Sequence, residues 1–310
     1  MANILVTGGA GFMGRWIAKN LLDKEHKVWI LDNLSNGSEK NIEEFKDKLR
    51  NFVIGDVKDK QLLSKIFENN FDICIHSAAS INVQESIDNP EKIFDNNCVG
   101  TFNVLEECRK HKTKMVFISS ALVYKTAEPG EKMSEEHPVN ILSPYGISKI
   151  NSENLVMSYF ETYGLPVVIL RPFSIYGPYQ RSDSEGGVMS IFINKKLEGK
   201  SLEVFGDGCQ GRDFFYIEDC AEFIVTASFS DKAIGQVFNA GSGVEIKIKE
   251  LAEKIAEDKI EIKFIKHHHP HAEVMNMRSD SSKAENILNW KPAINLEQGI
   301  IKTTQWLKNQ

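Results

Sequence analysis

The chain has 310 residues, of which 42% are hydrophobic and 26% charged, and its formal net charge at pH 7 is −6. At ~150 residues per domain, this length predicts one large or two modest domains with a substantial hydrophobic core. The mildly acidic charge argues against a surface for nucleic acids or anionic membranes, and no stretch approaches the ~20 apolar residues of a membrane span.

Short strand-like runs alternate with longer helical patterns from the first residues to Arg171. Strands are predicted at Asn3–Thr7, Lys27–Leu31, Phe52–Ile54, Ile73–His76, Met115–Ser119 and Val167–Arg171. Helices are predicted at Phe12–Leu22, Gln61–Phe67, Ile93–Arg109 and Ser143–Tyr163. This alternation is typical of βαβ units, and strands that are apolar at nearly every position fit a sheet covered on both faces. The sequence therefore predicts an α/β protein with a doubly wound parallel sheet.

The pattern changes after Pro172, where Gly, Pro and Ser cluster and the helix and strand signals mix irregularly. We therefore expect a first domain over residues 1–173 and a smaller mixed α/β domain over residues 174–310. Later segments are expected to cross back into the first domain. The sequence shows no internal repeat and no long linker between the two parts.

A glycine-rich turn, residues 7–14 (TGGAGFMG), lies between the first predicted strand and the first predicted helix. It satisfies the pattern GxGxxG through Gly9, Gly11 and Gly14. Glycine is needed there because backbone N–H groups at the helix N-terminus must approach a pyrophosphate closely. Asp32 ends the next strand at the spacing expected for a carboxylate that binds the adenosine ribose. Because this carboxylate would repel a 2′-phosphate, the sequence predicts a Rossmann-type site that prefers NAD to NADP.

A serine, a tyrosine and a lysine are the candidate catalytic residues. Tyr145 and Lys149 are four residues apart on a helix that Ser143 can cap, so they share one helix face. A phenol is a poor base at neutral pH, and a nearby ammonium is expected to lower its pKa. Ser120, just past a predicted strand, could hydrogen-bond the same substrate oxygen. The pattern YxxxK alone is common, but its place after a dinucleotide-binding half favours catalysis over an exposed surface pair.

The cysteines and histidines suggest neither disulfides nor a metal. The five cysteines form no CxxC pair, and the chain starts without a basic leader or a cleavage site. We therefore expect reduced thiols and a cytoplasmic location. Residues 266–271 (KHHHPH) contain four histidines, but no Cys or paired acids complete a site, so we expect a polar loop and no metal.

Several ordered segments together resemble the extended short-chain dehydrogenase/reductase superfamily, in particular its nucleotide-sugar epimerases of the UDP-glucose 4-epimerase type. The resemblance covers essentially the whole chain. The matching segments include residues 31–37 (LDNLSNG), 76–79 (HSAA), 96–101 (NNCVGT), 119–124 (SSALVY), 143–149 (SPYGISK), 171–178 (RPFSIYGP), 205–208 (FGDG) and 212–214 (RDF). The resemblance implies an enzyme with a Rossmann-type cofactor domain and a nucleotide-sugar domain.

The resemblance also implies the residues that bind each ligand. Those implied for NAD are Gly8, Gly11, Phe12, Met13, Gly14, Asp32, Asn33, Ser35, Asn36, Gly37, Asp56, Val57, Ser77, Ala78, Ala79, Asn97, Tyr145, Lys149 and Phe173. Those implied for a nucleotide-diphosphate sugar are Ser120, Tyr145, Ser174, Val188, Glu203, Phe205, Arg212, Glu273 and Met277. A guanidinium such as that of Arg212 can fork onto phosphate oxygens, and the alternative is a surface arginine paired with Asp213.

The residues after Ser120 favour one reaction within that superfamily. Its dehydratases and decarboxylases usually carry acidic residues there, whereas this chain has Ala121 and Leu122, which cannot move protons. The resemblance thus implies that Tyr145 removes the proton of the sugar 4-hydroxyl while the C4 hydride passes to NAD. The 4-keto sugar then turns over and receives the hydride on its other face. The expected activity is a UDP-sugar 4-epimerase, on the glucose or the N-acetylated pair.

Other functions stay open on the sequence alone. One alternative is another nucleotide-sugar chemistry, such as C2 epimerisation of a CDP sugar or reduction of a 4-keto sugar, and another is a non-catalytic dinucleotide sensor. The superfamily often has an arginine shortly before Glu273. Here one of the histidines of the run from His267 to His271 is the hypothetical replacement at the phosphate, and replacement of His269 and His271 is the test. The resemblance also implies a homodimer through the helices at Ile93–Arg109 and Ser143–Tyr163.

Overall fold

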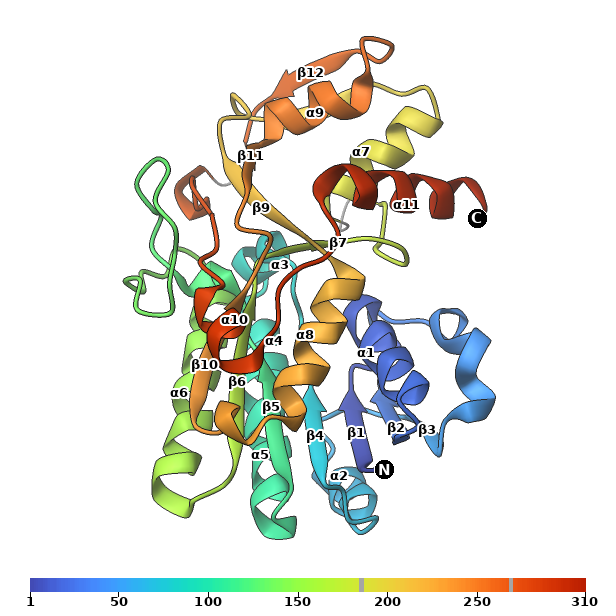
Figure 1. Cartoon of the computed structure of the whole chain (residues 1–310), viewed down its shortest axis with the longest axis vertical. Coiled ribbons are helices and arrows are strands. Elements are labelled where there is room, and N and C mark those ends of the chain that lie inside the picture. The colour runs from blue at the N-terminus through green and yellow to red at the C-terminus, as the bar shows by residue number, and fades with distance from the viewer. Residues whose placement is uncertain (184–186, 268–269) are drawn as a thin grey trace.

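A seven-stranded parallel sheet forms the centre of the molecule (Figure 1). The computed structural model describes residues 1–183, 187–267 and 270–310. From edge to edge the sheet contains β10 (Gln236–Ala240), β6 (Val167–Pro172), β5 (Lys114–Ile118), β4 (Ile73–His76), β1 (Asn3–Thr7), β2 (Lys27–Asp32) and β3 (Asn51–Ile54). All neighbouring strands are parallel, so the predicted doubly wound parallel sheet is confirmed.

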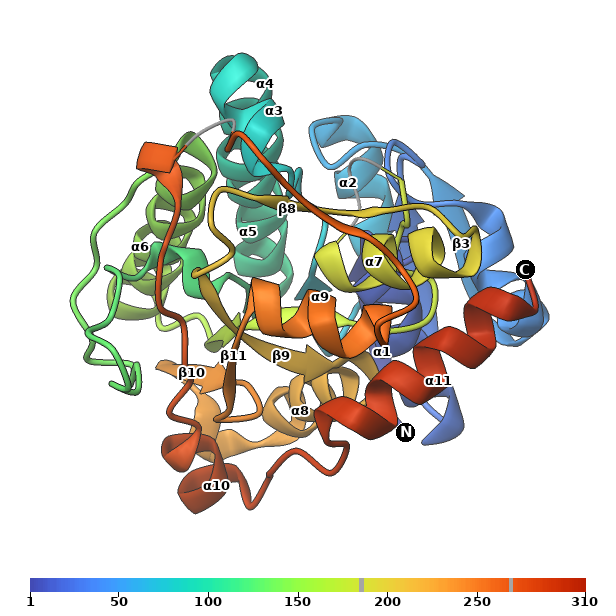
Figure 2. The ribbon, with the colours of Figure 1, turned by 90° about the horizontal axis from the view of Figure 1, so that it is seen from above.

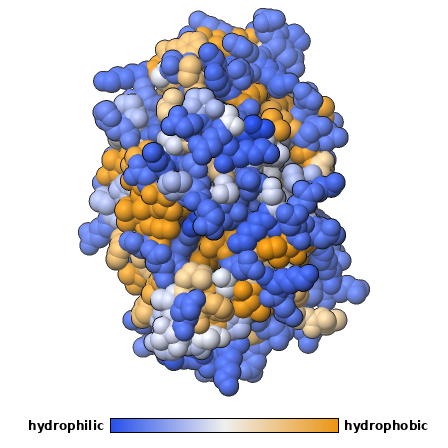
Figure 3. Space-filling model, turned by 60° about the vertical axis from the view of Figure 1, so that its left-hand side comes forward, coloured by the Kyte–Doolittle hydropathy of each residue, from blue (hydrophilic) through white to orange (hydrophobic). Residues whose placement is uncertain are grey.

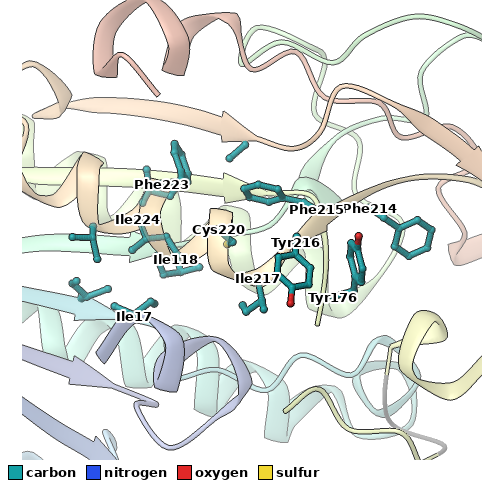
Figure 4. Packing of buried hydrophobic residues seen from close by; sticks show 14 of the residues in the cluster. Ile17, Ile118, Tyr176, Phe214, Phe215, Tyr216, Ile217, Cys220, Phe223 and Ile224 are labelled. Atoms are coloured by element: carbon teal, nitrogen blue, oxygen red, sulfur yellow. The ribbon is translucent and has the colours of Figure 1, made fainter. Parts of the chain in front are cut away.

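Helices cover both faces of this sheet. The main ones are α1 (Phe12–Asp23), α2 (Lys60–Phe67), α5 (Gly100–His111), α6 (Pro144–Tyr163) and α8 (Ile217–Phe229). α1 and α8 bury apolar side chains with one face, while α2, α5 and α6 pack on the other. Figure 4 shows Ile17 of α1, Ile118 of β5 and Ile224 of α8 gathered in the first of these layers. Their burial follows from helical spacing of apolar residues against an apolar sheet.

The prediction of one continuous α-helix over Ile93–Arg109 is wrong in its bounds and its continuity. The structure has α4 (Pro90–Phe94), a π-helical turn η2 (Asp95–Val99) and then α5. The extra residue in this turn accompanies the buried Asn97, whose amide oxygen accepts a 2.8 Å hydrogen bond from the backbone N–H of Ser80. The contact between Asn97 and Ser80 therefore accompanies the change from an α-helix to a π-helical turn. The spacing of apolar residues in the sequence does not reveal this change.

The part of the chain after Pro172 builds a second layer above the carboxyl ends of the strands (Figures 1 and 2). Its elements are β7 (Ser174–Tyr176), α7 (Val188–Leu197), β8 (Leu202–Phe205), β9 (Gly211–Tyr216), β11 (Glu245–Lys247), α9 (Ile248–Ala256), β12 (Ile262–Ile265) and α11 (Leu296–Lys308). They include a three-stranded sheet β11-β9-β7 and the pair β12-β8. α8 and β10 return to the large sheet. We keep as a proposal the division into domains 1–173 and 174–310.

Further elements lie between the main helices and strands. They are η1 (Glu39–Lys48), α3 (Val83–Asp88), η3 (Ala121–Val123), η4 (Asp231–Ala233), η5 (Pro270–Ala272) and α10 (Ser282–Leu288). α10 packs beside β10, so a late segment of the chain lies against the large sheet. α11 follows it in the upper layer. Across the described ranges, no helix combines the length and apolar character that a membrane crossing requires.

Candidate active site

A cleft of about 550 Å³ lies where the strands of the large sheet end. Its walls come from the residues that follow β1 to β5 and from the end of β6. The carboxyl edge of an open parallel sheet is the usual place for a ligand. The predicted site residues that line the cleft are Gly8, Gly11, Phe12, Met13, Gly14, Asp32, Asn33, Ser35, Asn36, Gly37, Asp56, Val57, Ser77, Ala78, Ala79, Ser120, Tyr145 and Phe173.

The predicted glycine turn forms one wall of the cleft. Gly8 has a φ of +69°, and a Cβ at this position would lie 2.8 Å from the backbone of Ala78. A Cβ on Gly14 would lie 2.0 Å from the carbonyl oxygen of Gly8. Helix α1 begins at Phe12, and no described side chain caps its first turn. Its backbone N–H groups are therefore available to an anion in the cleft.

Asp32 connects two loops of the cleft. Its carboxylate accepts a 2.9 Å hydrogen bond from the N–H of Ala10 and a 2.8 Å bond from the N–H of Leu34. Burial raises the pKa of Asp32 above its ordinary value, and the bonds from these amides oppose that rise. Beside it, the amide of Asn33 donates a 3.0 Å bond to the carboxylate of Asp56. The structure thus brings Asp32, Asn33 and Asp56 together near the ends of β2 and β3.

The predicted serine, tyrosine and lysine meet where β5 ends beside α6. Ser120 and Tyr145 both line the cleft, and the Ser120 side chain opposes the rise that burial causes in the pKa of Tyr145. The hydroxyl of Ser143 accepts a 3.2 Å bond from an N–H in the first turn of α6 and so caps the helix, as predicted. Lys149 is buried one turn after Tyr145, and its Nζ donates a 2.8 Å bond to the carbonyl oxygen of Ile118. Only the tyrosine and the serine of this group face the cleft directly.

Burial dominates the protonation of these groups. It raises the pKa of Tyr145 to about 12, while the side chain of Ser120 opposes the rise. The expected lowering of the tyrosine pKa is therefore wrong in this structure, because desolvation of a phenolate outweighs the stabilising contacts. Burial also lowers the pKa of Lys149 to about 8, and the charge of Glu153 opposes that lowering.

Two predicted cofactor residues, Asn97 and Lys149, lie behind the wall of the cleft. The amide nitrogen of Asn97 donates 2.9 Å bonds to the carbonyl of Ser80 and to the hydroxyl of Ser148. Ser80 lines the cleft, and Ser148 precedes Lys149 on α6. Asn97 therefore joins a cleft loop to the helix of Tyr145 rather than pointing into the cleft.

Part of the predicted substrate set forms a separate polar cluster in the upper layer. Arg212 on β9 forms an ion pair with Glu273 and donates a 2.7 Å bond to the carbonyl of Val274. Nε2 of His267 lies 2.9 Å from the carboxylate of Glu273, and its ring centre is 5.9 Å from that of Phe205. Burial lowers the pKa of Arg212 to about 10. A guanidinium, an imidazole and an aromatic ring are thus placed together, and a guanidinium is suited to bind phosphate or carboxylate oxygens.

The remaining predicted substrate residues are more dispersed. Glu203 pairs with Lys195, and Met277 is buried in a cluster that contains the cleft residue Phe173. Ser174 begins β7 and Val188 begins α7. These residues and the polar cluster lie outside the boundary of the cleft as the described residues delimit it.

Asp213 is not the partner of Arg212. Its buried carboxylate accepts hydrogen bonds from the backbone N–H and hydroxyl groups of Ser242 and Ser279, at 2.6–2.9 Å. The alternative of a surface pair between Arg212 and Asp213 is therefore wrong. Of the four histidines in the sequence hypothesis, His267 contacts Glu273, His271 is exposed, and His268 and His269 lie outside the described residues.

Sequence reasoning missed several residues of the cleft. They include Ser119, Ile81, Asn82, Asn96, Tyr179, Gln180 and Arg181. The last three follow β7, and Nη1 of Arg181 reaches to 3.5 Å from the amide oxygen of Asn36 on the opposite wall. A Gly-Pro turn before Tyr179 marks a loop in the sequence, but the return of that loop over the cleft depends on distant contacts. Asn96 could have been found from its neighbour Asn97 in the same motif.

Comparisons with known proteins agree with this geometry. The sequence profile of the NAD dependent epimerase/dehydratase family matches residues 4–241. A UDP-glucose 4-epimerase of Mycolicibacterium smegmatis is 34% identical over 316 residues, which cover 99% of this chain and 98% of that protein. The structure of Pal from Bacillus thuringiensis is 50% identical with a TM-score of 0.98, covering 99% of both chains. A UDP-glucose 4-epimerase of Thermus thermophilus, solved with NAD, is 30% identical with a TM-score of 0.91, covering 99% of both chains.

The residues of the cleft fit an NAD molecule. The glycine turn leaves no space for side chains at Gly8 and Gly14, so backbone can approach a pyrophosphate. Asp32 and Asn33 lie at the edge where an adenosine ribose would be bound. At the other end, the buried hydroxyl of Ser119 has no hydrogen-bond partner among the described residues, although Ser119 lines the cleft. A bound ligand with polar groups would satisfy this hydroxyl.

Proposed function

Because the chain belongs to the NAD-dependent epimerase/dehydratase family and is thus an NAD-dependent enzyme acting on nucleotide sugars, we propose that it is a nucleotide-sugar 4-epimerase. It would invert C4 of a UDP sugar, in the glucose/galactose pair or the N-acetylated pair, through a transient 4-keto sugar. The relatives named as UDP-glucose 4-epimerases support this proposal.

The observation that carries the proposal is that the described residues lining the cleft place no carboxylate beside Ser120 and Tyr145. Among the described residues that line the cleft, the carboxylates are Asp32 and Asp56, both near the ends of β2 and β3. The positions directly after Ser120 are apolar, and Ala121 is buried in a hydrophobic cluster. An elimination or a decarboxylation needs a further acid or base near the sugar, whereas epimerisation through a ketone needs one group that removes and returns a proton.

The side chains of this chain then divide the work as follows. When bound, NAD supplies an acceptor for the hydride and later returns it. Tyr145 takes the proton of the sugar 4-hydroxyl and gives it back to the 4-keto oxygen. Ser120, which lines the cleft with Tyr145, would donate to the same substrate oxygen and so stabilise its developing charge. Lys149 places a positive charge behind the tyrosine, which favours the phenolate.

For the substrate, the polar cluster of the upper layer is the proposed anchor. Arg212 would bind the diphosphate, and Phe205 would contact the base of the nucleotide. Glu273, which contacts both Arg212 and His267, would keep these two side chains in place. An anchor at the diphosphate leaves the sugar free to rotate, so that its two faces can be presented in turn.

A second copy of the chain is the proposed protein partner. Phe94 of α4, Phe102 of α5 and Ile147 of α6 are 50%, 39% and 43% exposed on neighbouring helices. A shallow groove on the surface beside them includes Leu142 and Pro144. Figure 3, with the α6 side turned forward, shows hydrophobic areas between hydrophilic ones on that side. Pairing of these helices with their copies would cover the exposed apolar side chains.

The decisive experiment is incubation of the purified protein, without added cofactor, with UDP-glucose, UDP-N-acetylglucosamine and their uronic acids. We expect NMR to show a mixture of the two C4 epimers of a neutral sugar. A parallel reaction with added NAD allows for loss of cofactor during purification. Product formation that consumes stoichiometric reduced nicotinamide nucleotide would instead identify a 4-keto reductase, and inversion at C2 would identify a C2 epimerase.

A further inference from the structure

Glu153 lies one turn beyond Lys149 on α6, so Tyr145, Lys149 and Glu153 share one helix face at four-residue spacing. Glu153 is 3% exposed, and Arg171 on the neighbouring strand β6 is 6% exposed. Nε of Arg171 donates a 2.9 Å hydrogen bond to one carboxylate oxygen of Glu153, and Nη2 pairs with the other oxygen. A buried ion pair with two contacts therefore lies next to the proposed catalytic lysine.

The same guanidinium continues the network away from α6. Nη1 of Arg171 donates a 2.8 Å bond to the hydroxyl of Tyr124, which donates a 2.7 Å bond to the amide oxygen of Asn239 on β10. The amide nitrogen of Asn239 donates a 3.0 Å bond to the carbonyl of Met133. The N–H of Met133 donates a 2.7 Å bond to the carbonyl of Arg278. The pair thus connects α6 to the segment before α10, which carries two predicted substrate residues.

Stability alone is a weak explanation for this pair. Burying two charges costs desolvation that their attraction only partly offsets, and apolar side chains of similar volume often serve as well. Arg171 and Glu153 are buried and joined by two contacts, and Arg171 is also hydrogen-bonded to Tyr124. This network suits a role in positioning neighbouring side chains such as Lys149.

Glu153 supplies the negative charge near Lys149. Burial lowers the pKa of Lys149 to about 8, and Glu153 is the first of the groups that oppose this lowering. Cys98 of η2 also faces the lysine, but burial raises its thiol pKa, so it stays neutral. Burial lowers the pKa of His76 to about 3, so this ring on β4 is neutral too. Tyr145, on the same helix, is a neutral phenol because burial raises its pKa to about 12.

We propose that Glu153 and Arg171 are a positioning pair for the active site: Glu153 keeps Lys149 in its ammonium form, and Arg171 holds Glu153 in place. The proposal rests on the proposed function in that Tyr145 and Lys149 are taken as its catalytic residues. Glu153 and Arg171 are absent from the described residues that line the cleft, so they act through Lys149 and not on the substrate.

The test is a charge substitution on each side of the pair. Glu153→Gln removes the negative charge and leaves Arg171 unpaired, so we expect the pKa of Lys149 to fall by about one pH unit. NMR of ¹³C-labelled lysine side chains, with the Lys149 signal assigned through Lys149→Arg, measures this value directly. The alkaline limb of the plot of kcat against pH should move to lower pH by the same amount as the Lys149 pKa. KM should stay nearly unchanged. Arg171→Gln releases Glu153 but also removes a positive charge, so it should change the pKa of Lys149 by less than Glu153→Gln does.

Two further variants make the result decisive. Glu161→Gln makes the same change at an exposed position of α6 and should leave the Lys149 titration unchanged. The double variant Glu153→Gln/Arg171→Gln leaves no charge unpaired, so it tests the proposal even where Glu153→Gln does not fold. We expect its Lys149 pKa to be lower than that of Arg171→Gln. Equal values in these two variants, or equal falls in both single variants, would overturn the proposal.

The titration also separates this inference from the proposed function. It requires neither substrate nor turnover, so a wild-type protein that inverts no UDP sugar would refute the 4-epimerase proposal alone. An unchanged Lys149 titration in an active Glu153→Gln enzyme would refute the positioning pair alone.

Discussion

Nζ of Lys149 donates a 2.8 Å hydrogen bond to the carbonyl oxygen of Ile118, the last residue of β5. Ser120 follows Ile118 two residues later, so this bond fixes α6 against the strand that leads to the serine. Lys149 does not line the cleft, whereas Tyr145 does. The lysine therefore lies behind the wall of the cleft, whereas the tyrosine hydroxyl is placed to meet a ligand in it.

Tyr145→Phe should reduce kcat by about 10²–10⁴-fold, because it removes the group that exchanges the proton. The fold should remain, since the ring stays in place and a single hydroxyl is lost. Turnover followed by NMR, together with a thermal melt, measures both effects. Tyr163→Phe is the matched control, since Tyr163 is 57% exposed on the same helix. A Tyr145→Phe enzyme within tenfold of the wild type would assign proton transfer to another group.

The local part of this site could be predicted from the sequence, but the long-range part could not. The strands Asn3–Thr7 and Ile73–His76 have the predicted bounds, because short apolar runs between turn residues determine buried parallel strands locally. The glycine turn and the capped start of α6 are likewise local. The bond from Lys149 to Ile118 depends on how α6 packs on β5, and no spacing within either segment encodes it.

The charges around the site illustrate the same limit. A lysine one turn after a tyrosine suggested a lowered tyrosine pKa, yet burial raises the pKa of Tyr145 to about 12. The degree of burial is a tertiary property, and it decides the sign of such shifts. The pairing of Arg212 with Glu273 instead of its neighbour Asp213 has the same origin, because adjacent residues on strand β9 point to opposite faces.

The buried His76 predicts a loss of stability in mild acid. Its ring nitrogens lie 2.7 Å from the hydroxyl of Thr7 and 3.1 Å from that of Thr101, and burial lowers its pKa to about 3. In the unfolded chain a histidine titrates near ~6.5, so below that pH the unfolded state binds a proton that the folded state does not. The stability present above pH ~6.5 is therefore lost as the pH falls, by up to about 1.4 kcal/mol per pH unit.

Urea unfolding of the wild type and of His76→Gln, at several pH values between ~7.5 and ~5, measures this contribution. The variant should lose less stability than the wild type as the pH falls, whatever its stability at neutral pH. His271→Gln, at an exposed position, should follow the wild type. Parallel curves for the wild type and His76→Gln would mean that His76 contributes nothing to the pH dependence.

The polar cluster predicts which histidine acts at the substrate. His267 contacts Glu273, the partner of Arg212, whereas His271 is exposed. His267→Ala should therefore raise KM for the nucleotide sugar by about 3–10-fold, because Glu273 and Arg212 lose a neighbour that orders them. kcat should change little, since Tyr145 is not involved. Steady-state kinetics of His267→Ala and His271→Ala test this, and a larger KM effect in His271→Ala would contradict the placement.

The exposed apolar side chains of α4, α5 and α6 predict the oligomeric state. If a second copy covers them, Phe102→Asp places a charge in a buried interface, where it is desolvated without a partner. We expect sedimentation equilibrium to show a dimer for the wild type and a monomer for Phe102→Asp. Ile301→Asp is the matched control, because Ile301 is 56% exposed on α11, in the other layer of the molecule. A wild-type monomer, or a dimer broken by Ile301→Asp and not by Phe102→Asp, would place the interface elsewhere or remove it.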